Sequence, residues 1–179
     1  MYNFYYSDPH FAHRNIIEYC DRPFESVEHQ IEEFIRRYNE KVGVDDLVLW
    51  LGDCFFGKSD TNILSRLNGR KELLRGNHDK CWTDTKFVKC GFEKVHRESF
   101  VDVIEEFSVR YSHYPYVGAT SDVRYLDRRL LREEGVTLIH GHTHSKEKFS
   151  LQAVHVGVDA WDYAPASKTE VLELLKNNR

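Results

Sequence analysis

Residues 47–53 read Leu-Val-Leu-Trp-Leu-Gly-Asp, and this stretch decides the fold class. Five apolar residues in a row predict a strand that is buried on both faces, as in a parallel or mixed sheet. Gly52 and Asp53 follow at its C-terminal end, where a Gly-Asp pair is typical of a turn. We therefore expect a sheet-based protein in which a buried strand ends beside a carboxylate.

Strand-like and helix-like segments alternate on both sides of this run. Strands are expected at residues 2–6, 71–74, 99–103, 107–111, 136–139 and 153–158, with a hairpin closing around Glu105 and Glu106. Helices are expected from Ser26 to Gly43, over residues 63–67, from residue 123 to near Gly135, and after the capping box Ser167-Lys168-Thr169-Glu170. The predicted architecture is α/β (α+β), with two β-sheets, one mixed and one more antiparallel, and helices outside them.

The composition is that of an ordinary globular protein with a mildly acidic charge. The chain has 179 residues, 41% of them hydrophobic and 30% charged, and its formal net charge is -4. No linker, repeat or low-complexity segment interrupts it, so we expect a single domain over residues 1–179. The acidic balance gives no strong nucleic-acid signal, although short oligonucleotides and nucleotides stay open as ligands.

Cysteine usage and hydropathy indicate a cytoplasmic protein. The four cysteines form no CxxC pair, which indicates reduced thiols rather than a disulfide framework. The N-terminus lacks the basic region of a signal peptide, and no stretch reaches the roughly 18–20 apolar residues of a membrane helix. Contact with a membrane is therefore not expected, and the sequence leaves the oligomeric state open.

Polar side chains with metal-ligand chemistry follow the predicted strands. Asp8 and His10 follow the first strand, Asp53 the second, Asn77, His78 and Asp79 the third, His113 a later strand, and His142 and His144 the strand ending near residue 139. In sheet-based folds, loops at strand ends bring distant parts of the sequence together. Five separate loops are thus expected to deliver these side chains to one place.

The residue types in these loops are those of a metal centre. Imidazole nitrogen with carboxylate and amide oxygen, and without thiolate, favours Mn²⁺, Zn²⁺ or Fe over a structural zinc site. Two divalent metal ions about 3.5–4 Å apart would share a carboxylate and a hydroxide, and Asp53 is the natural bridge. The hydroxide would attack phosphorus in line with the leaving oxygen. Each motif alone is also typical of a turn, and only their joint occurrence favours the metal centre.

Five motifs in order resemble those of the calcineurin-like metallophosphoesterases. They are Asp8-x-His10, Gly52-Asp53, Gly76-Asn77-His78-Asp79, His113 with the following Tyr114-Pro115, and Gly141-His142-Thr143-His144. The match spans residues 7–144. The resemblance implies a four-layer sandwich, in which two β-sheets are flanked by helices and the site lies at the edge.

The same resemblance assigns roles to individual residues. One ion would bind Asp8, His10, Asp53 and His144, and the second would bind Asp53, Asn77, His113 and His142. His78 would contact a phosphoryl oxygen or protonate the leaving group, with Asp79 holding its imidazole, because an alkoxide leaves poorly without a proton or compensating charge. Manganese is the preferred metal, with zinc, iron or magnesium as alternatives.

Further residues are candidates for contact with a substrate. They are His13, Arg14, Asn15, Phe55 and Phe56, and a candidate lid over residues 116–131 that contains Arg124, Arg128 and Arg129. Basic and aromatic side chains can bind phosphate or stack on a base, although a helix start, a solvated face or core packing explains each of them as well. His29 and His96 are expected at the surface, His140 packed within a strand, and His155 has no assigned role.

The function that follows is a binuclear-metal-dependent phosphoesterase acting on small phosphate esters. Phosphodiesters of nucleotides or other small molecules are the preferred substrates. The alternatives are a phosphomonoesterase or protein phosphatase, a DNA nuclease, and a non-catalytic scaffold with the same fold. The full set of ligand types with His78 argues against a scaffold, and the acidic charge argues against a nuclease.

Overall fold

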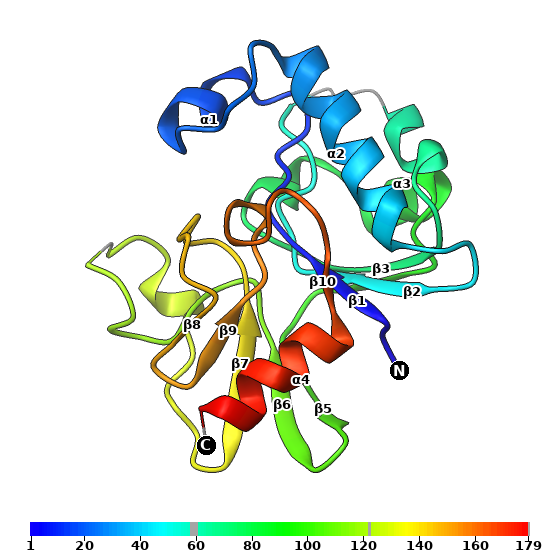
Figure 1. Ribbon diagram of the computed structural model, residues 1–179. Coiled ribbons are helices and arrows are strands. Elements are labelled where there is room, and N and C mark those ends of the chain that lie inside the picture. Colours follow the sequence, from blue (N-terminus) through cyan, green and yellow to red (C-terminus); the bar gives the residue numbers. More distant parts are fainter. Residues whose placement is uncertain (58–60, 122, 179) are drawn as a thin grey trace.

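The structure is a computed structural model that describes residues 1–57, 61–121 and 123–178 (Figure 1). Two five-stranded mixed sheets lie at its centre. The first has the order β10-β1-β2-β3-β4 and consists of β1 (Phe4–Tyr6), β2 (Leu47–Trp50), β3 (Arg70–Leu74), β4 (Lys94–His96) and β10 (Ala166–Ser167). The second has the order β5-β6-β7-β9-β8 and consists of β5 (Phe100–Ile104), β6 (Phe107–Tyr111), β7 (Val136–His140), β8 (Phe149–Ser150) and β9 (Ala153–His155).

Helices flank the sheets. The α-helices are α1 (Arg14–Tyr19), α2 (Val27–Lys41), α3 (Asp84–Cys90) and α4 (Lys168–Asn177), and the 3-10 helices are η1 (Thr61–Arg66), η2 (His78–Cys81), η3 (Leu126–Arg128) and η4 (Val158–Ala160). In Figure 1, α2 and α3 cover one face of the first sheet, and α4 crosses in front of the second. Among the described residues, no helix combines the length and apolar character needed to cross a membrane.

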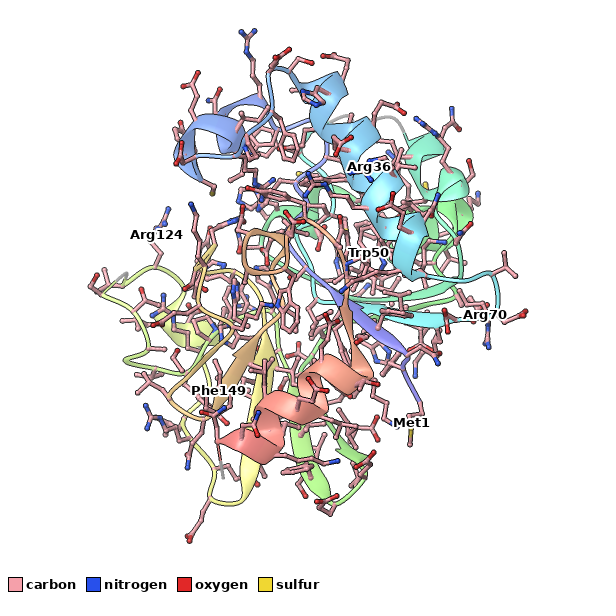
Figure 2. The ribbon with its side chains drawn as sticks, viewed as in Figure 1. Met1, Arg36, Trp50, Arg70, Arg124 and Phe149 are labelled. Carbon is pink, nitrogen blue, oxygen red and sulfur yellow. The ribbon has the colours of Figure 1, made fainter. Side chains whose placement is uncertain are left out.

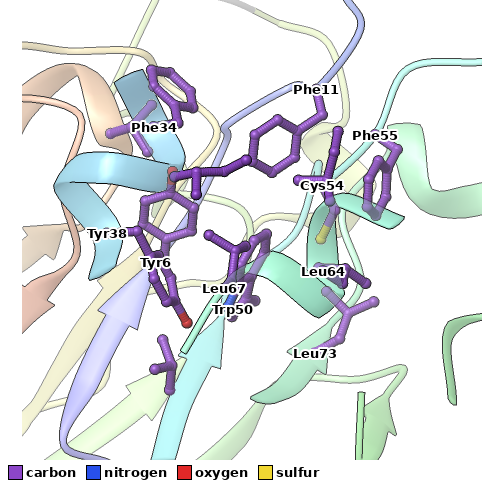
Figure 3. Close-up of a cluster of buried hydrophobic side chains, with 14 of the residues drawn as sticks. Tyr6, Phe11, Phe34, Tyr38, Trp50, Cys54, Phe55, Leu64, Leu67 and Leu73 are labelled. Carbon is purple, nitrogen blue, oxygen red and sulfur yellow. The ribbon is translucent and has the colours of Figure 1, made fainter. Parts of the chain in front are cut away.

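Strand β2 is buried on both faces, as the apolar run predicts. Val48 and Trp50 point toward α2 and pack in the first hydrophobic cluster, part of which Figure 3 shows. Leu49 and Leu51 point the other way and pack in a second cluster, which the second sheet shares. Because side chains alternate along a strand, a strand between two apolar layers reads as a continuous apolar run.

The second cluster joins the two sheets to the C-terminal helix. Tyr5 of β1 and Tyr111 of β6 stack with ring centroids 5.7 Å apart, and Val171 of α4 is fully buried in the same cluster. The opposite face of the second sheet carries a small cluster of Leu138, Ala153 and Tyr116, and Ala119 and Leu130 pack against it. Residues that follow His113 in the chain therefore cover part of this face.

The starts of α2 and α4 agree with the sequence, whereas α1 and α3 were not predicted. Ser26 caps α2 by accepting a hydrogen bond from the backbone N–H of His29, and Ser167 and Glu170 form the capping box of α4. The helix expected from residue 123 to Gly135 is wrong, since only η3 forms there. Val123 and Leu131 are 74% and 79% exposed, so the apolar spacing that predicted this helix does not correspond to a buried face.

The topology brings loops from both sheets to one edge. Strands β1, β2 and β3 run parallel, so the loops after them emerge side by side. Strands β6, β7 and β9 are also parallel to one another. A bridge between Ser7, just after β1, and Gly157, just after β9, ties the ends of the two sheets together. Every predicted metal ligand lies in a loop at this edge.

Candidate metal centre

The structure gathers the predicted ligands from five loops into two adjoining groups. The ligand atoms of Asp8, His10 and His144 lie within 4.8 Å of one another, and so do those of Asp53, His113 and His142. Two further such groups adjoin them, one of His10, Asp53 and His78, and one of Cys20, His144 and Asp159. The first two groups match the division into two ion sites that the family resemblance implies.

Asp53 lies between the two groups. Its Oδ2 is 3.6 Å from His10 Nε2 of the first group and 3.5 Å from His113 Nε2 of the second. Its Oδ1 accepts a hydrogen bond of 2.8 Å from the backbone N–H of His78, which fixes the orientation of the carboxylate. One carboxylate oxygen thus faces both groups, which is the position of a bridging ligand.

The second group converges on His113. The Nδ1 atom of His113 donates to the backbone oxygen of Leu51 at 2.7 Å, and this contact selects Nε2 as the atom that faces the site. That Nε2 lies 3.1 Å from Asn77 Oδ1 and 3.1 Å from His142 Nδ1. Asn77 therefore joins the group through its amide oxygen, as predicted.

The first group contains buried polar atoms that the described residues leave unsatisfied. Asp8 is fully buried, and its Oδ2 accepts from the backbone N–H of His142 at 2.8 Å, while its Oδ1 has no hydrogen-bond partner. His10 is 2% exposed, and both of its ring nitrogens also lack a hydrogen-bond partner. Buried polar groups normally have partners, and a divalent cation would supply one for oxygen and nitrogen together. The residues present therefore fit a metal ion.

His144 is oriented by two residues that sequence reasoning missed. Its Nδ1 lies 2.8 Å from Asp159 Oδ2, which leaves Nε2 to face Asp8 and His10. Arg22 holds Asp159 through two hydrogen bonds of 2.8 and 3.0 Å. The same guanidinium also donates to the backbone oxygens of Asp8 and Pro9, at 2.9 and 3.0 Å. Arg22 thus fixes the loop of Asp8 directly and acts on the His144 ring through Asp159.

The backbone of the site is strained at five predicted ligands. Asp8, His10, Asp53, His142 and His144 have φ angles between 50° and 71°, in the left-handed region that side chains other than glycine disfavour. Each such residue costs about 1–3 kcal/mol, and such strain persists only where the surrounding structure imposes it. Its concentration at these positions is typical of a functional site.

Two motif glycines permit the close approach of the loops. A Cβ atom on Gly76 would overlap Asp53 Oδ1, and one on Gly141 would overlap Asp8 Oδ2. Both glycines directly precede a predicted ligand. Only glycine leaves room for the carboxylates at these two points.

His78 and Asp79 lie at the site, but Asp79 does not hold the His78 ring. Oxygen Oδ2 of Asp79 accepts from the backbone N–H groups of Asp53 and Gly76, both at 2.8 Å, and Oδ1 accepts from that of Cys54 at 3.1 Å. Asp79 therefore ties the loop after β2 to the loop after β3. The His78 ring is one-third exposed, and its Nε2 lies 4.0 Å from Asp53 Oδ2. Within the described residues, no contact joins that ring to Asp79, which corrects the predicted role of this carboxylate.

The electrostatics of the cluster favour bound positive charge. Burial acts against the charged form of His113, yet Asp53 outweighs it and raises the pKa of His113 to about 9. Burial acts in the same way on His144, where the hydrogen bond to Asp159 dominates and raises the pKa to about 10. Burial alone would raise the pKa of Asp53, but His113 holds it well below its usual range. The carboxylates that stabilise these protonated imidazoles would also stabilise a divalent cation bound to the rings in place of the protons.

A pocket of about 450 Å³ opens above the ligands. Its walls include Ile16 and Tyr19 from α1 and Arg124 and Tyr125 from the segment 116–131, and Arg124 projects on the side that faces α1 (Figure 2). The predicted lid segment thus contributes to the same pocket as the metal ligands.

The other candidate residues divide between the pocket and the core. His13 lines the pocket and stacks on Phe56, with ring centroids 3.9 Å apart and planes 8° apart. Phe55 is instead 3% exposed and stacks on Trp82 in the first hydrophobic cluster. His140 is buried in β7, as expected, and its Nδ1 lies 2.8 Å from the oxygen of Gly141.

Sequence comparison finds relatives that match the chain over almost its whole length. The Gene 66 proteins of Mycobacterium phages L5 and D29 are each 31% identical to it over 195 and 196 residues, covering 96% of this chain and 92% and 94% of theirs. The uncharacterized protein MJ1445 of Methanocaldococcus jannaschii is 30% identical over 184 residues, covering 97% of this chain and 90% of that one. The chain belongs to the Gene 66 protein family. No protein-family model matches it.

The fold of this Gene 66 family member also has a solved counterpart. The crystal structure of the protein of unknown function AQ665 from Aquifex aeolicus has a TM-score of 0.75 and 25% sequence identity, and the match covers 96% of this chain and 97% of that one. The names of these relatives assign no activity. The site itself is therefore the basis for a function of this Gene 66 family member.

Proposed function

We propose that the chain is a binuclear-metal-dependent phosphoesterase of the calcineurin-like metallophosphoesterase type. The observation that carries the proposal is the position of Asp53 Oδ2, which faces His10 at 3.6 Å and His113 at 3.5 Å from two separate ligand groups. The four-layer sandwich of that family is part of the proposal, and the two mixed sheets with their flanking helices are compatible with it.

The donor set indicates which residues would hold the two ions. Asp8, His10, Asp53 and His144 would hold one, and Asp53, Asn77, His113 and His142 would hold the other. When bound, two such ions supply Lewis-acid charge and a water acidified enough to act as the nucleophile. Oxygen and imidazole ligands without thiolate suit Mn²⁺, with Zn²⁺, Fe²⁺ and Mg²⁺ as alternatives.

The chain's own groups orient the reaction. His78 lines the pocket with its ring one-third exposed, so it can donate a hydrogen bond to a phosphoryl oxygen or a proton to the leaving oxygen. Its backbone is fixed by the hydrogen bond from its N–H to Asp53 Oδ1. Asp79 keeps the two flanking loops together through three backbone N–H groups. His78 is thereby placed over the site without needing a carboxylate on its ring.

The pocket favours a small ester with an aromatic group. Its volume of about 450 Å³ lies within the usual range for small-molecule sites. The ring of Phe56 is 41% exposed and lies 5.6 Å from His78, and the stack of His13 on Phe56 continues this aromatic surface. Nucleobases stack on such surfaces, so a nucleotide phosphodiester is the substrate class we propose.

The hydrolysis of model esters tests this function. Protein stripped of metal by a chelator would be assayed on bis-p-nitrophenyl phosphate and p-nitrophenyl phosphate, with Mn²⁺, Zn²⁺ or Mg²⁺ added back. We expect turnover only with added metal, and faster turnover of the diester. A faster monoester rate would indicate a phosphomonoesterase. Stoichiometric metal binding without turnover of any ester, nucleotide or oligonucleotide would favour the scaffold.

Substitution of His78 by alanine tests the leaving-group role. We expect His78→Ala to bind both metals and to lose about a hundredfold or more in turnover, because a positioned acid typically contributes that much. The loss should be smaller for p-nitrophenyl esters, whose leaving group needs little protonation, than for alkyl esters. His29→Ala, at an exposed histidine on α2, is the matched control. Equal rates of His78→Ala and the wild type on an alkyl ester would refute the role.

A further inference from the structure

Arg129 is a buried charge without a partner. Arg129 is only 7% exposed, and within the described residues none of its three guanidinium nitrogens has a hydrogen-bond partner. Arg22, comparably buried, makes five hydrogen bonds. Arginine carries its charge throughout the physiological range, so an unpaired buried guanidinium is strongly disfavoured. A bound anion would compensate the charge of this group.

The surroundings of Arg129 form a basic pocket of about 330 Å³. Arg75, Arg97 and Arg128 line it together with Arg129, and the hydroxyl-bearing Ser99 and Ser112 are also in its wall. We call this the Arg129 pocket. It shares His113 and Tyr114 with the neighbourhood of the metal centre, but none of its other lining residues is a predicted ligand.

The acidic side chains nearby are engaged elsewhere or lie beyond reach of Arg129. Asp84 accepts from both Arg75 and Arg97, at 2.9 and 2.6 Å. Asp127 lies 3.3 Å from Arg128, and both side chains are mostly exposed. Glu98 lines the pocket too, yet Arg129 has no ion pair with it. The positive charge of Arg129 is therefore the one that the lining carboxylates leave uncompensated.

Tyr114 separates this pocket from the metal centre. Its ring lies 5.0 Å from that of His142 and 5.7 Å from that of Tyr125, so the three rings form a wall between the two pockets. The charge of Arg129 nevertheless acts electrostatically across this wall of rings. Burial, and then His113, lower the pKa of His142 to about 3, and Arg129 contributes in the same direction. An anion beside Arg129 would thus lie close to the metal centre, because the predicted ligand His113 also lines the Arg129 pocket.

We propose that the Arg129 pocket binds an oxyanion of the phosphate class. Planar guanidinium groups match phosphate oxygens in pairs, and serine hydroxyls can donate to the remaining oxygens. The volume accommodates a tetrahedral group with part of what it is attached to. Free inorganic phosphate and the phosphoryl group of a larger ligand share this chemistry. The site would bind its anion whether or not the metal centre is catalytic.

The test is thermal unfolding of the full chain with and without phosphate. The protein would be measured as purified and again after chelation, which removes any cation that could itself bind phosphate. We expect millimolar phosphate to raise the unfolding midpoint of the wild type by ligand-linked stabilisation, and acetate to do so less. Arg129→Met should bind phosphate about tenfold or more weakly, because a charge-assisted contact is lost. It should also unfold at a higher temperature than the wild type in phosphate-free buffer, since the unpaired charge is gone.

Matched variants and a second measurement keep the test decisive. Arg132→Met removes the same charge from an exposed position three residues away, and it should keep the phosphate response. If Arg129→Met does not fold, a phosphate titration of the wild type followed by amide NMR should move residues 97–99 and 127–130 rather than residues 8–10 and 142–144. Equal phosphate responses of wild type and Arg129→Met, or shifts confined to the metal loops, would overturn the proposal.

A retained response in a protein without esterase activity would overturn only the proposed function. A response to a nucleoside diphosphate that exceeds the response to inorganic phosphate would identify a larger ligand as the source.

Discussion

Replacing Asp53 by asparagine is expected to weaken the binding of both metal ions at once. Asp53 Oδ2 faces both ligand groups, and the amide has nearly the same shape but no charge. The hydrogen bond from the His78 N–H can persist, so the fold should be retained. We expect affinity at both positions to fall by at least about a hundredfold, beyond what loss of an outer contact typically causes. Calorimetric titration with Mn²⁺ and elemental analysis of dialysed protein measure this directly.

The control for this variant is Asp102→Asn on β5. This variant makes the same carboxylate-to-amide change, and within the described residues the Oδ1 atom of Asp102 accepts from the neighbouring N–H of Val103. Its metal content should equal that of the wild type. Two full-occupancy ions in Asp53→Asn would refute the bridging role of this carboxylate, and loss of one ion alone would place Asp53 on a single metal.

Replacing Arg22 by methionine is expected to be the most destabilising single change outside the apolar core. Arg22 is 4% exposed and pairs with Asp159, and it donates to the backbone of Asp8 and Pro9. Removing it breaks the buried ion pair with Asp159 and leaves His144 as the remaining charged partner of that carboxylate, and breaking a buried pair typically costs about 3–5 kcal/mol. Urea unfolding of the metal-free chain measures the loss. Arg36→Met, which removes exposed ion pairs on α2, should leave the urea midpoint nearly unchanged, because solvent screens such pairs.

A positioning role for Arg22 predicts more than lost stability. Asp159 orients His144 and Arg22 fixes the Asp8 loop, so Arg22→Met should weaken one metal position more than the other. In a Mn²⁺ titration, the position that contains Asp8, His10 and His144 should lose affinity while the position around His113 is affected less. Equal weakening of both positions, or none, would show that Arg22 acts on the fold alone.

The buried strand and the ligand loops could be predicted because each is encoded by a short continuous stretch of sequence. An unbroken run of five apolar residues fits a strand between two apolar layers, and β2 lies between two such layers. The positions of Asp8, Asp53 and His113 at strand ends followed from the order of strands and turns. Parallel pairing then brings those ends to one edge, which the structure shows.

The contacts behind the ligands could not be predicted, because they join residues far apart in the sequence. Arg22 and Asp159 are separated by 137 positions, and neither lies in a motif. Asp79 illustrates a different limit. Its place next to His78 suggested a contact between the two side chains, but successive residues of a tight turn point in different directions, and the carboxylate satisfies buried backbone N–H groups instead.

The segment after His113 shows where apolar spacing misleads. The apolar residues from Val123 to Leu131 repeat at helical intervals, yet Val123 and Leu131 are exposed and the charged Arg129 is buried. Tyr125 adopts a left-handed conformation with φ 58°, which interrupts a right-handed helix. Within this segment Leu130 packs against the third hydrophobic cluster, while Arg124 and Arg129 line the two pockets.

Anomalous X-ray diffraction from crystals grown with Mn²⁺ would test the binuclear centre most directly. We expect two manganese peaks about 3.5–4 Å apart, one on each side of Asp53 Oδ2. One peak should lie beside Asp8, His10 and His144, and the other beside Asn77, His113 and His142. A single peak, or peaks that do not contact Asp53, would contradict the account.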